Sequence, residues 1–254
     1  MTDQAAKAAR FHALHVKGKP LMLYNIWDPG SAKAVEAAGA QALATGSLPV
    51  AMAAGFADGE DVPLDYALAN IARIVAGTDL PVTLDFESGY ALDPGQITEN
   101  IEKAVATGIV GVNFEDQVIG GSGLHAIDAQ TARLKAVRAG STDLFINART
   151  DIFLKAAPDT HSSEMLAEAI TRAQAFADAG ASGFFAPGLR DEAMIAELCD
   201  TVSLPVNMIT LPGTPPPAKL AELGVARISY GPMVYRAMSK WLEDAARAAF
   251  DTVG

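Results

Sequence analysis

Residues 105–112 read VATGIVGV, a stretch that links the end of a helical pattern to the start of an apolar run through a single glycine. The same form recurs as EAAGAQAL (36–43), DAGASGFF (178–185) and AELGVARI (221–228). Glycine is favoured just past the end of a helix, and an apolar run that follows at once is typical of a buried strand. The repeated joint therefore predicts a helix followed directly by a strand, four times along the chain.

Outward from these joints, short apolar runs alternate with longer segments of helical period. ITENIEKAVATG and SSEMLAEAITRAQAFADAG have the clearest amphipathic pattern, whereas AKLAELG is short. This alternation is typical of strand–helix units that build a parallel sheet. We expect eight strands, at residues 21–25, 42–46, 82–85, 111–115, 144–148, 183–186, 206–208 and 227–229. Because no Ser/Pro-rich or charged spacer divides the chain, residues 1–254 are predicted to form one α/β domain, a (β/α)8 barrel of the TIM type rather than an open doubly wound sheet.

The composition and net charge of the chain argue against some classes of binding partner. The chain has 254 residues, half of them apolar, and 30 acidic against 19 basic residues give a net charge of −11. With no basic cluster, neither nucleic acid nor an anionic membrane surface is expected as a partner. The single cysteine, Cys199, excludes an internal disulfide, and the first twenty residues lack the apolar segment of a secretory signal. We expect a cytoplasmic protein.

Polar residues gather at the carboxyl ends of the expected strands. They are Asn25, Asp28, Thr45, Gly46, Asp85, Glu87, Glu115, Asp116, Asn147, Arg149, Asp151 and Asn207. In a barrel these ends form one rim, where active sites are built. The alternative is that these residues only cap the helices that follow. In LDFESGY (84–90), moreover, Asp85 and Glu87 point the same way along a strand and repel each other unless a cation lies between them.

Four motifs occur in a fixed order: YNIWDPGSAKAVEAAGAQALATGS (24–47), LDFESGY (84–90), GVNFEDQ (111–117) and INARTD (146–151). Together they resemble the isocitrate lyase and phosphoenolpyruvate mutase superfamily, from about Phe11 to Met238, and look closest to its smaller phosphonomutase-like members. The resemblance implies a (β/α)8 barrel that binds Mg²⁺, or Mn²⁺, and an α-keto acid or its enolate at the carboxyl-terminal rim.

The resemblance also implies roles for individual residues. Asp85 matches the acid that contacts the metal, and Glu87, Glu115 and Asp58 match acids that hold its waters or complete its shell. Many relatives have Asp where this chain has Glu87, which is one methylene longer. Mg²⁺ prefers few protein oxygens and several waters, so such a set is chemically sensible. The alternative for Glu87 is an ion pair with Arg149 across the barrel mouth.

Arg149 matches the arginine that grips the substrate's carboxylate or phosphonate, although a purely structural ion pair would also explain it. The small-residue loop Thr45, Gly46 and Ser47 matches the loop whose N–H groups and hydroxyl receive the carboxylate, although a tight turn needs the same residues. The remaining substrate-binding candidates are Tyr24, Trp27, Asp28 and Asn207. For Asn207, a helix cap is the alternative.

The loop after the fourth strand, EDQVIGGSGLHAID (115–128), departs from the lyases of this superfamily. It lacks their cysteine and lysines, so the catalytic candidates are Arg149, Glu115 and His125. Gly120, Gly121 and Gly123 would let the loop close as a lid that brings His125 over the substrate; alternatively the loop is a flexible turn with His125 in solvent.

The function expected is therefore a Mg²⁺-dependent lyase or phosphonomutase-type isomerase. It would act at C3 of a small α-keto acid, on a C–C or C–P bond, without cleaving isocitrate. The alternative is a barrel that binds such anions without turnover.

The last expected helix, 233–250, carries more apolar residues than one barrel flank needs. The resemblance implies that this helix is exchanged between neighbouring subunits, which form a homotetramer as a dimer of dimers. A simple closing helix is the alternative.

Overall fold

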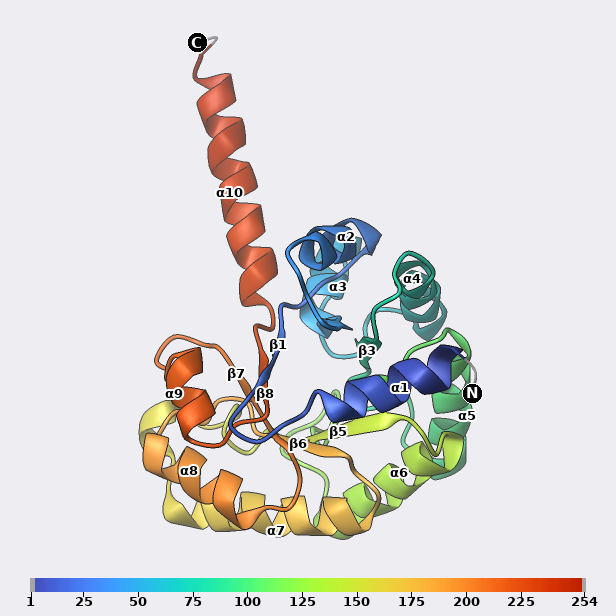
Figure 1. Cartoon of the computed structure of the whole chain (residues 1–254), viewed down its shortest axis with the longest axis vertical. Coiled ribbons are helices and arrows are strands. Elements are labelled where there is room, and N and C mark those ends of the chain that lie inside the picture. The colour runs from blue at the N-terminus through green and yellow to red at the C-terminus, as the bar shows by residue number, and fades with distance from the viewer. Residues whose placement is uncertain (1–2, 253–254) are drawn as a thin grey trace.

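The computed structural model describes residues 3–252 and shows eight parallel strands in one sheet (Figure 1), ordered β1-β8-β7-β6-β5-β4-β3-β2. The strands are β1 Leu21–Leu23, β2 Leu43–Ala44, β3 Val82–Asp85, β4 Gly111–Glu115, β5 Phe145–Arg149, β6 Gly183–Phe185, β7 Val206–Ile209 and β8 Arg227–Ser229. The helices are α1 Asp3–Ala13, α2 Pro29–Ala37, α3 Ser47–Ala54, α4 Leu64–Ala76, α5 Pro94–Ala106, α6 Ile127–Gly140, α7 Ser163–Asp178, α8 Glu192–Thr201, α9 Pro217–Glu222 and α10 Met233–Phe250, with a 3-10 turn at Pro158–Thr160.

The sheet closes on itself between β1 and β2. Ile26 and Thr45 form a parallel bridge just beyond the two strands. The Ile26 N–H donates to the Ala44 carbonyl at 2.9 Å, and the Gly46 N–H donates to the Ile26 carbonyl at 3.2 Å. The predicted (β/α)8 barrel is confirmed.

The glycine joints have the backbone conformation that their sequence predicts. Gly39, Gly108, Gly180 and Gly224 have φ values of 94°, 96°, 99° and 91°. This left-handed conformation ends a helix and turns the chain into the next strand, and residues with a Cβ adopt it at a cost.

The ends of the strands differ from the prediction by one or two residues. β1 and β2 are shorter than expected, and β5 lies one residue further along the chain. The polar residues at the ends of the first two predicted strands lie just beyond β1 and β2: Asn25 bonds with its side chain to neighbouring strand ends, and Thr45 keeps an isolated bridge to Ile26.

α1 covers the amino-terminal end of the barrel. Its Phe11 is fully buried, and the ring packs edge-on against Phe145 at the start of β5, with 5.4 Å between ring centroids. With that end filled by apolar side chains, the opposite end is the one open to a ligand.

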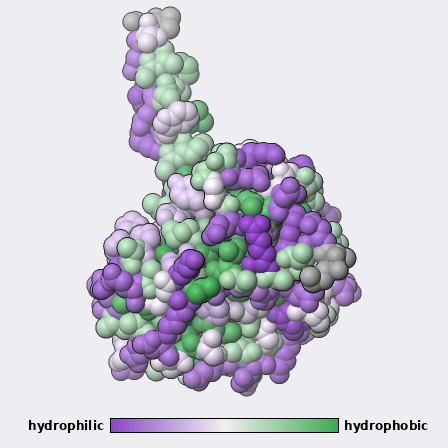
Figure 2. All heavy atoms as spheres, in the orientation of Figure 1, coloured by the Kyte–Doolittle hydropathy of each residue, from purple (hydrophilic) through white to green (hydrophobic). Residues whose placement is uncertain are grey.

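α10 extends away from the barrel, starting beside β8 (Figure 1). Apolar residues occur along this projecting helix (Figure 2), and Trp241, Leu242 and Phe250 are 68%, 57% and 76% exposed. None of the helices within residues 3–252 has both the length and the apolar character that crossing a bilayer requires.

Candidate active site

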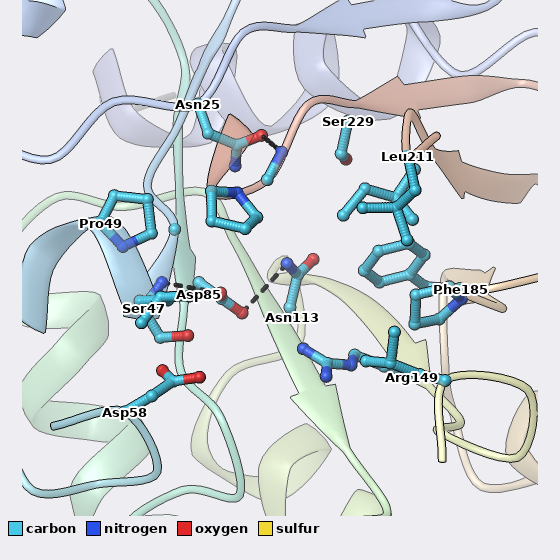
Figure 3. A pocket seen from close by; sticks show the side chains of 17 residues that line it. Asn25, Ser47, Pro49, Asp58, Asp85, Asn113, Arg149, Phe185, Leu211 and Ser229 are labelled. Carbon is cyan, nitrogen blue, oxygen red and sulfur yellow. Dashed lines mark hydrogen bonds between the residues drawn. The ribbon is translucent and has the colours of Figure 1, made fainter. Parts of the chain in front are cut away.

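A pocket lies at the carboxyl-terminal ends of the strands, as expected for a barrel enzyme (Figure 3). It comprises about 700 Å³ of space free of protein atoms, part of it open to solvent. The lining residues are Asn25, Gly46, Ser47, Leu48, Pro49, Asp58, Asp85, Asn113, Arg149, Leu154, Phe185, Pro187, Ile209, Leu211, Ser229, Gly231 and Pro232.

Asp85 ends β3 and is held by donors on both carboxylate oxygens. The Ser47 N–H donates to Oδ2 at 2.9 Å, and the Asn113 Nδ2 donates to Oδ1 at 3.2 Å. The Asp85 N–H in turn donates to the Thr45 hydroxyl at 3.0 Å. Because Ser47 is the first residue of α3, the amino-terminal end of this helix faces the Asp85 carboxylate.

Three further acids lie close to Asp85. The pKa of Glu87 is raised to about 8, mainly by burial and then by the charges of Asp85, Asp58 and Glu115. The pKa of Asp58 is also raised, first by burial and then by Asp85. The repulsion expected from LDFESGY is therefore present, and it involves four carboxylates rather than two.

No three acidic, histidine or cysteine side chains among residues 3–252 converge closely enough to complete a metal site by themselves. Mg²⁺ usually binds proteins through one or two carboxylates and keeps several waters. Asp85 and Asp58 line the pocket, whereas Glu87 and Glu115 do not, and one or two carboxylates of this kind fit the needs of such an ion.

The loop that carries Asp58 is fastened to the turn after β3. The Glu60 N–H donates to the Glu87 Oε2 at 2.9 Å, and the Glu60 Oε1 accepts the N–H groups of Ser88 and Tyr90 at 3.0 and 2.8 Å. Within residues 3–252, the non-glycine residues with positive φ are Glu60, Glu87 and Tyr90, at 62°, 50° and 57°. Such backbone strain persists where surrounding contacts enforce it, and it clusters at functional sites.

Arg149 ends β5 on the other side of the pocket. Its Nε and Nη2 bind the two carboxylate oxygens of Asp151 at 2.6 and 2.9 Å, and its Nη1 lies 2.9 Å from the Glu115 Oε2. Burial by itself would lower the pKa of Arg149, but these two carboxylates raise it above its usual value. The alternative in which Glu87 is the partner of Arg149 is wrong, since Glu115 and Asp151 hold that guanidinium.

A buried network continues behind Arg149. Asp116 accepts the Asp151 N–H at 3.0 Å on one oxygen and the Arg172 Nη1 at 3.1 Å on the other. Burial raises the pKa of Asp116 to about 6, while its hydrogen bonds oppose the increase. The same Arg172 nitrogen donates to the His125 carbonyl at 3.0 Å. Arg172 on α7 therefore supports both Arg149 and the end of the loop after β4.

Asn113 and Arg227 were not among the predicted site residues. The Asn113 Oδ1 accepts the Asn147 Nδ2 at 2.9 Å and the Arg227 Nη2 at 3.0 Å, which fixes the amide that faces Asp85. Arg227 is fully buried, its Nε and Nη1 have no hydrogen-bond partner, and burial lowers its pKa to about 9. The signal in the sequence was a polar residue inside an apolar strand, as in GVNFE and ARIS.

Three substrate-binding candidates lie outside the pocket lining. Asp28 caps the start of α2, the role given as the alternative for residues at the strand ends. The rings of Tyr24 and Trp27 pack against those of Tyr230 and Tyr235, at centroid distances of 4.9 and 5.0 Å. These side chains follow β1 but contact the helix and loop that come after β8, so they lie beside the pocket rather than in it.

Asn207 is buried inside the barrel and also does not line the pocket. Its Oδ1 accepts the Asn147 Nδ2 at 2.9 Å, and its Nδ2 donates to the Arg227 carbonyl at 3.1 Å. In the structure the Asn207 side chain therefore connects β7 to β5 and β8, and it neither faces the pocket nor caps a helix.

In the loop of Thr45, Gly46 and Ser47, the last two residues line the pocket and Thr45 does not, and the backbone N–H groups of all three already have acceptors. They donate to the Thr83 carbonyl at 3.1 Å, the Ile26 carbonyl at 3.2 Å and the Asp85 Oδ2 at 2.9 Å. Binding of a substrate carboxylate by this loop stays a prediction, and it requires one of these bonds to be shared or exchanged.

His125 lies outside the pocket lining and is not a free solvent residue either. The backbone N–H of His125 donates to the Asp116 carbonyl at 2.7 Å, and the ring Nε2 is buried without a hydrogen-bond partner. Burial lowers the pKa of its ring. The Gln117–Leu124 bridge closes the glycine loop as a turn, so the lid would have to break these bonds to bring His125 over the substrate.

The sequence pattern of the phosphoenolpyruvate phosphomutase family matches residues 11–250, nearly the whole chain. The chain belongs to this family. It is 45% identical to a protein from Burkholderia cenocepacia J2315, described provisionally as a phosphonomutase, whose crystal structure superposes with a TM-score of 0.94 over 97% of this chain and 99% of that one.

Two further relatives have named activities. The oxaloacetate decarboxylase of Paraburkholderia xenovorans (strain LB400) is 30% identical over 87% of this chain and 74% of its own length. The 2-methylisocitrate lyase of Escherichia coli (strain K12) is 28% identical over 92% and 81%. The predicted membership of the isocitrate lyase and phosphoenolpyruvate mutase superfamily, whose members are lyases and mutases, is confirmed, and with it the prediction of an enzyme.

Proposed function

We propose that the chain is a Mg²⁺- or Mn²⁺-dependent enzyme that cleaves a C–C bond at C3 of a small α-keto acid. The observation that carries this proposal is the arrangement across one pocket of Asp85, with its neighbouring acids, facing the guanidinium of Arg149 (Figure 3). The two sides match the two needs of such a substrate, a cation for the keto oxygen and a planar donor for the carboxylate.

The mutual repulsion of the acids supports the metal. Asp85 would hold the ion, and Asp58, Glu87 and Glu115 would hold its waters. When bound, the ion would stabilise negative charge on the keto oxygen as the bond to C3 breaks.

The chain's own residues would orient the substrate. Arg149 would bind its carboxylate, while Asp151 and Glu115 keep the guanidinium in place through bonds of 2.6 to 2.9 Å. Asn113 would keep the Asp85 carboxylate directed at the metal. The pocket lining contains no histidine, cysteine, lysine or tyrosine, so a reaction with little proton handling, such as decarboxylation, suits it best.

C–P cleavage is the second possibility within the family, and the charges favour C–C chemistry. A phosphonate carries more negative charge than a carboxylate, and the lining offers it one guanidinium that two carboxylates already neutralise. The named activity of the Paraburkholderia relative, oxaloacetate decarboxylation, agrees with this choice.

The metal role can be tested with oxalate, an analogue of the enolate. Calorimetry should show oxalate binding in Mg²⁺ and none in EDTA, and Asp85→Asn should abolish it. The matched control is Asp178→Asn, which removes an exposed acid of α7. Equal affinity in Mg²⁺ and EDTA, or unchanged affinity in Asp85→Asn, would contradict the metal role.

Turnover separates catalysis from binding alone. Oxaloacetate, phosphonopyruvate and a 2-methylmalate-type acid should be tested by product detection beside isocitrate and 2-methylisocitrate. We expect turnover of a keto acid and no cleavage of either isocitrate, because the loop after β4 has no cysteine or lysine to handle the proton at C3. Tight, metal-dependent binding without any turnover would favour the anion-binding barrel instead.

A further inference from the structure

Glu87 does not line the main pocket, but it lines a second cavity next to it, which we call the side cavity. The side cavity comprises about 330 Å³ of space free of protein atoms, part of it open to solvent. Ser47 and Asp85 line both spaces, whereas Glu87 lines the side cavity alone. The side cavity is therefore the space through which Glu87 can reach a group bound to Asp85. Its lining also includes Thr45, so several oxygen atoms are present as partners for an ordered water.

Two separate segments of the chain close the side cavity, and Glu60 joins them. Val62 comes from the loop between α3 and α4, and Tyr90 comes from the turn after β3. The Glu60 Oε1 accepts the N–H groups of Ser88 and Tyr90 at 3.0 and 2.8 Å. The Glu60 N–H donates to the Glu87 Oε2 at 2.9 Å. We call these three hydrogen bonds the Glu60 lock.

The backbone at the Glu60 lock is strained. Glu60, Glu87 and Tyr90 have φ values of 62°, 50° and 57°, and all three take part in the lock. Residues that carry a Cβ keep such values only where surrounding contacts enforce them. The hydrogen bonds of the lock are contacts of this kind, so both segments should relax when the lock is removed.

The two segments that Glu60 joins carry acids that repel each other. Asp58 lies beside Ser47 and Asp85 at the main pocket (Figure 3), and Glu87 lies at the side cavity. After burial, the charges of Asp85 and Asp58 are the main causes that raise the pKa of Glu87, so these carboxylates are close enough to interact. A cation bound at Asp85 would offset the repulsion, and metal binding and the lock should therefore stabilise each other.

We propose that Glu60 is a positioning residue for the metal, because the Glu60 lock keeps Asp58 and Glu87 beside Asp85, where they can hold the metal's waters. The inference rests on the proposed function, since it concerns the same metal. It adds that the order of the lock depends on the metal, and that Glu87 acts through water in the side cavity.

The affinity for Mn²⁺, measured by electron paramagnetic resonance in the presence of oxalate, tests this role. Glu60→Ala should weaken Mn²⁺ binding about 10- to 100-fold, the usual effect of removing a group that orients a metal's ligands. Glu60→Gln keeps an oxygen that can accept the N–H groups of Ser88 and Tyr90, and it should restore most of the affinity.

Glu36→Ala is the matched control. Glu36 on α2 also fastens a loop, because its Oε1 accepts the Thr78 hydroxyl at 2.9 Å ahead of β3, and it lines neither the main pocket nor the side cavity. This variant should keep the wild-type affinity for Mn²⁺ even if its urea midpoint of unfolding falls.

Hydrogen exchange measured by NMR reports the Glu60 lock directly, without any turnover. The backbone N–H groups of Ser88 and Tyr90 donate to Glu60, so their exchange requires the lock to open. Mg²⁺ should slow their exchange in wild type about 5- to 150-fold, the usual range of coupling between two sites. In Glu60→Ala their exchange should be faster and should not respond to Mg²⁺.

The outcomes separate this inference from the proposed function. If Glu60→Ala binds Mn²⁺ as tightly as wild type while Asp85→Asn does not bind it, the lock is only structural, and the metal role stands without the inference. If the exchange of Ser88 and Tyr90 in wild type does not respond to Mg²⁺, the lock and the metal are not coupled, and the inference is overturned even if Glu60→Ala fails to fold. If wild type binds no Mn²⁺, the metal role and the inference are both overturned.

Discussion

The carboxyl of Glu87 is buried beside three other acids, and replacing it by Gln tests how their repulsion affects stability. The pKa of Glu87 is raised from 4.5 to about 8 by burial and by Asp85, Asp58 and Glu115. Between these two pH values the folded state keeps a proton that the unfolded state has released. Raising the pH through this window therefore favours unfolding.

The magnitude follows from the pKa difference. At 1.36 kcal/mol per pKa unit, ionised Glu87 costs the folded protein roughly 5 kcal/mol once the pH exceeds 8. Glutamine has the same shape, and its oxygen can still accept the Glu60 N–H. We expect the stabilisation of Glu87→Gln over wild type to be roughly 4 kcal/mol larger at pH 8.5 than at pH 5, in EDTA.

Urea unfolding at a series of pH values measures this difference. Glu197→Gln, in an exposed residue of α8, is the matched control and should follow wild type. Mg²⁺ should restore stability to wild type at pH 8.5, because a cation offsets the repulsion among the acids. A variant whose stability falls with pH as steeply as that of wild type would refute the reasoning.

Three further expectations concern residues around the site. Arg149→Lys should weaken metal-dependent oxalate binding about 10- to 100-fold in calorimetry, because lysine cannot bind Asp151 bidentately while also facing the ligand; a change below twofold would contradict it. Arg227→Met should leave the urea midpoint of unfolding equal or higher, because the substitution removes a buried and partly unpaired charge. It should weaken oxalate binding, because the Asn113 side-chain oxygen loses a donor. Lower stability with unchanged oxalate binding would count against this. Light scattering should find that the wild-type protein is a homotetramer and that Trp241→Glu, on the projecting α10, dissociates it. A wild-type monomer at micromolar concentration would contradict the expectation that α10 is exchanged between subunits.

Local sequence sufficed for the barrel because the signals that build it are local. A joint such as VATGIVGV ends a helix through one glycine and restarts a strand from the next residues, and both events depend on backbone preferences within a few residues. The acids of LDFESGY were placed by a second local signal, the end of an apolar run, because strand ends meet at one rim of a barrel. The expectation that both acids share one face of a strand was wrong, since β3 ends at Asp85 and Glu87 follows in a turn with a φ of 50°. The gathering of Asp85 and Glu87 at the rim could therefore be expected before any contact was known.

Partnerships between strands depended on the tertiary structure. In the parallel ladder Asp85 is in register with Asn113, Asn113 with Asn147, and Glu115 with Arg149. These alignments place the amide of Asn113 beside Asp85 and give Arg149 to Glu115 rather than to Glu87. The register between neighbouring strands follows from barrel closure and from the stagger of each strand against the next. No single stretch of sequence encodes either of these.

The direction of side chains beyond the strand ends was likewise decided by tertiary contacts. Tyr24, Trp27 and Asp28 follow a rim strand in the same way as Asn25, yet only Asn25 faces the pocket, where the N–H groups of Tyr230 and Gly231 bind its oxygen at 3.0 and 2.8 Å. After the last residue of a strand the period of two no longer applies, and the chain follows whichever loops and helices lie nearest. The sequence by itself determined the barrel and the acids at its rim, whereas the packing of distant strands decided which of the rim residues form one site.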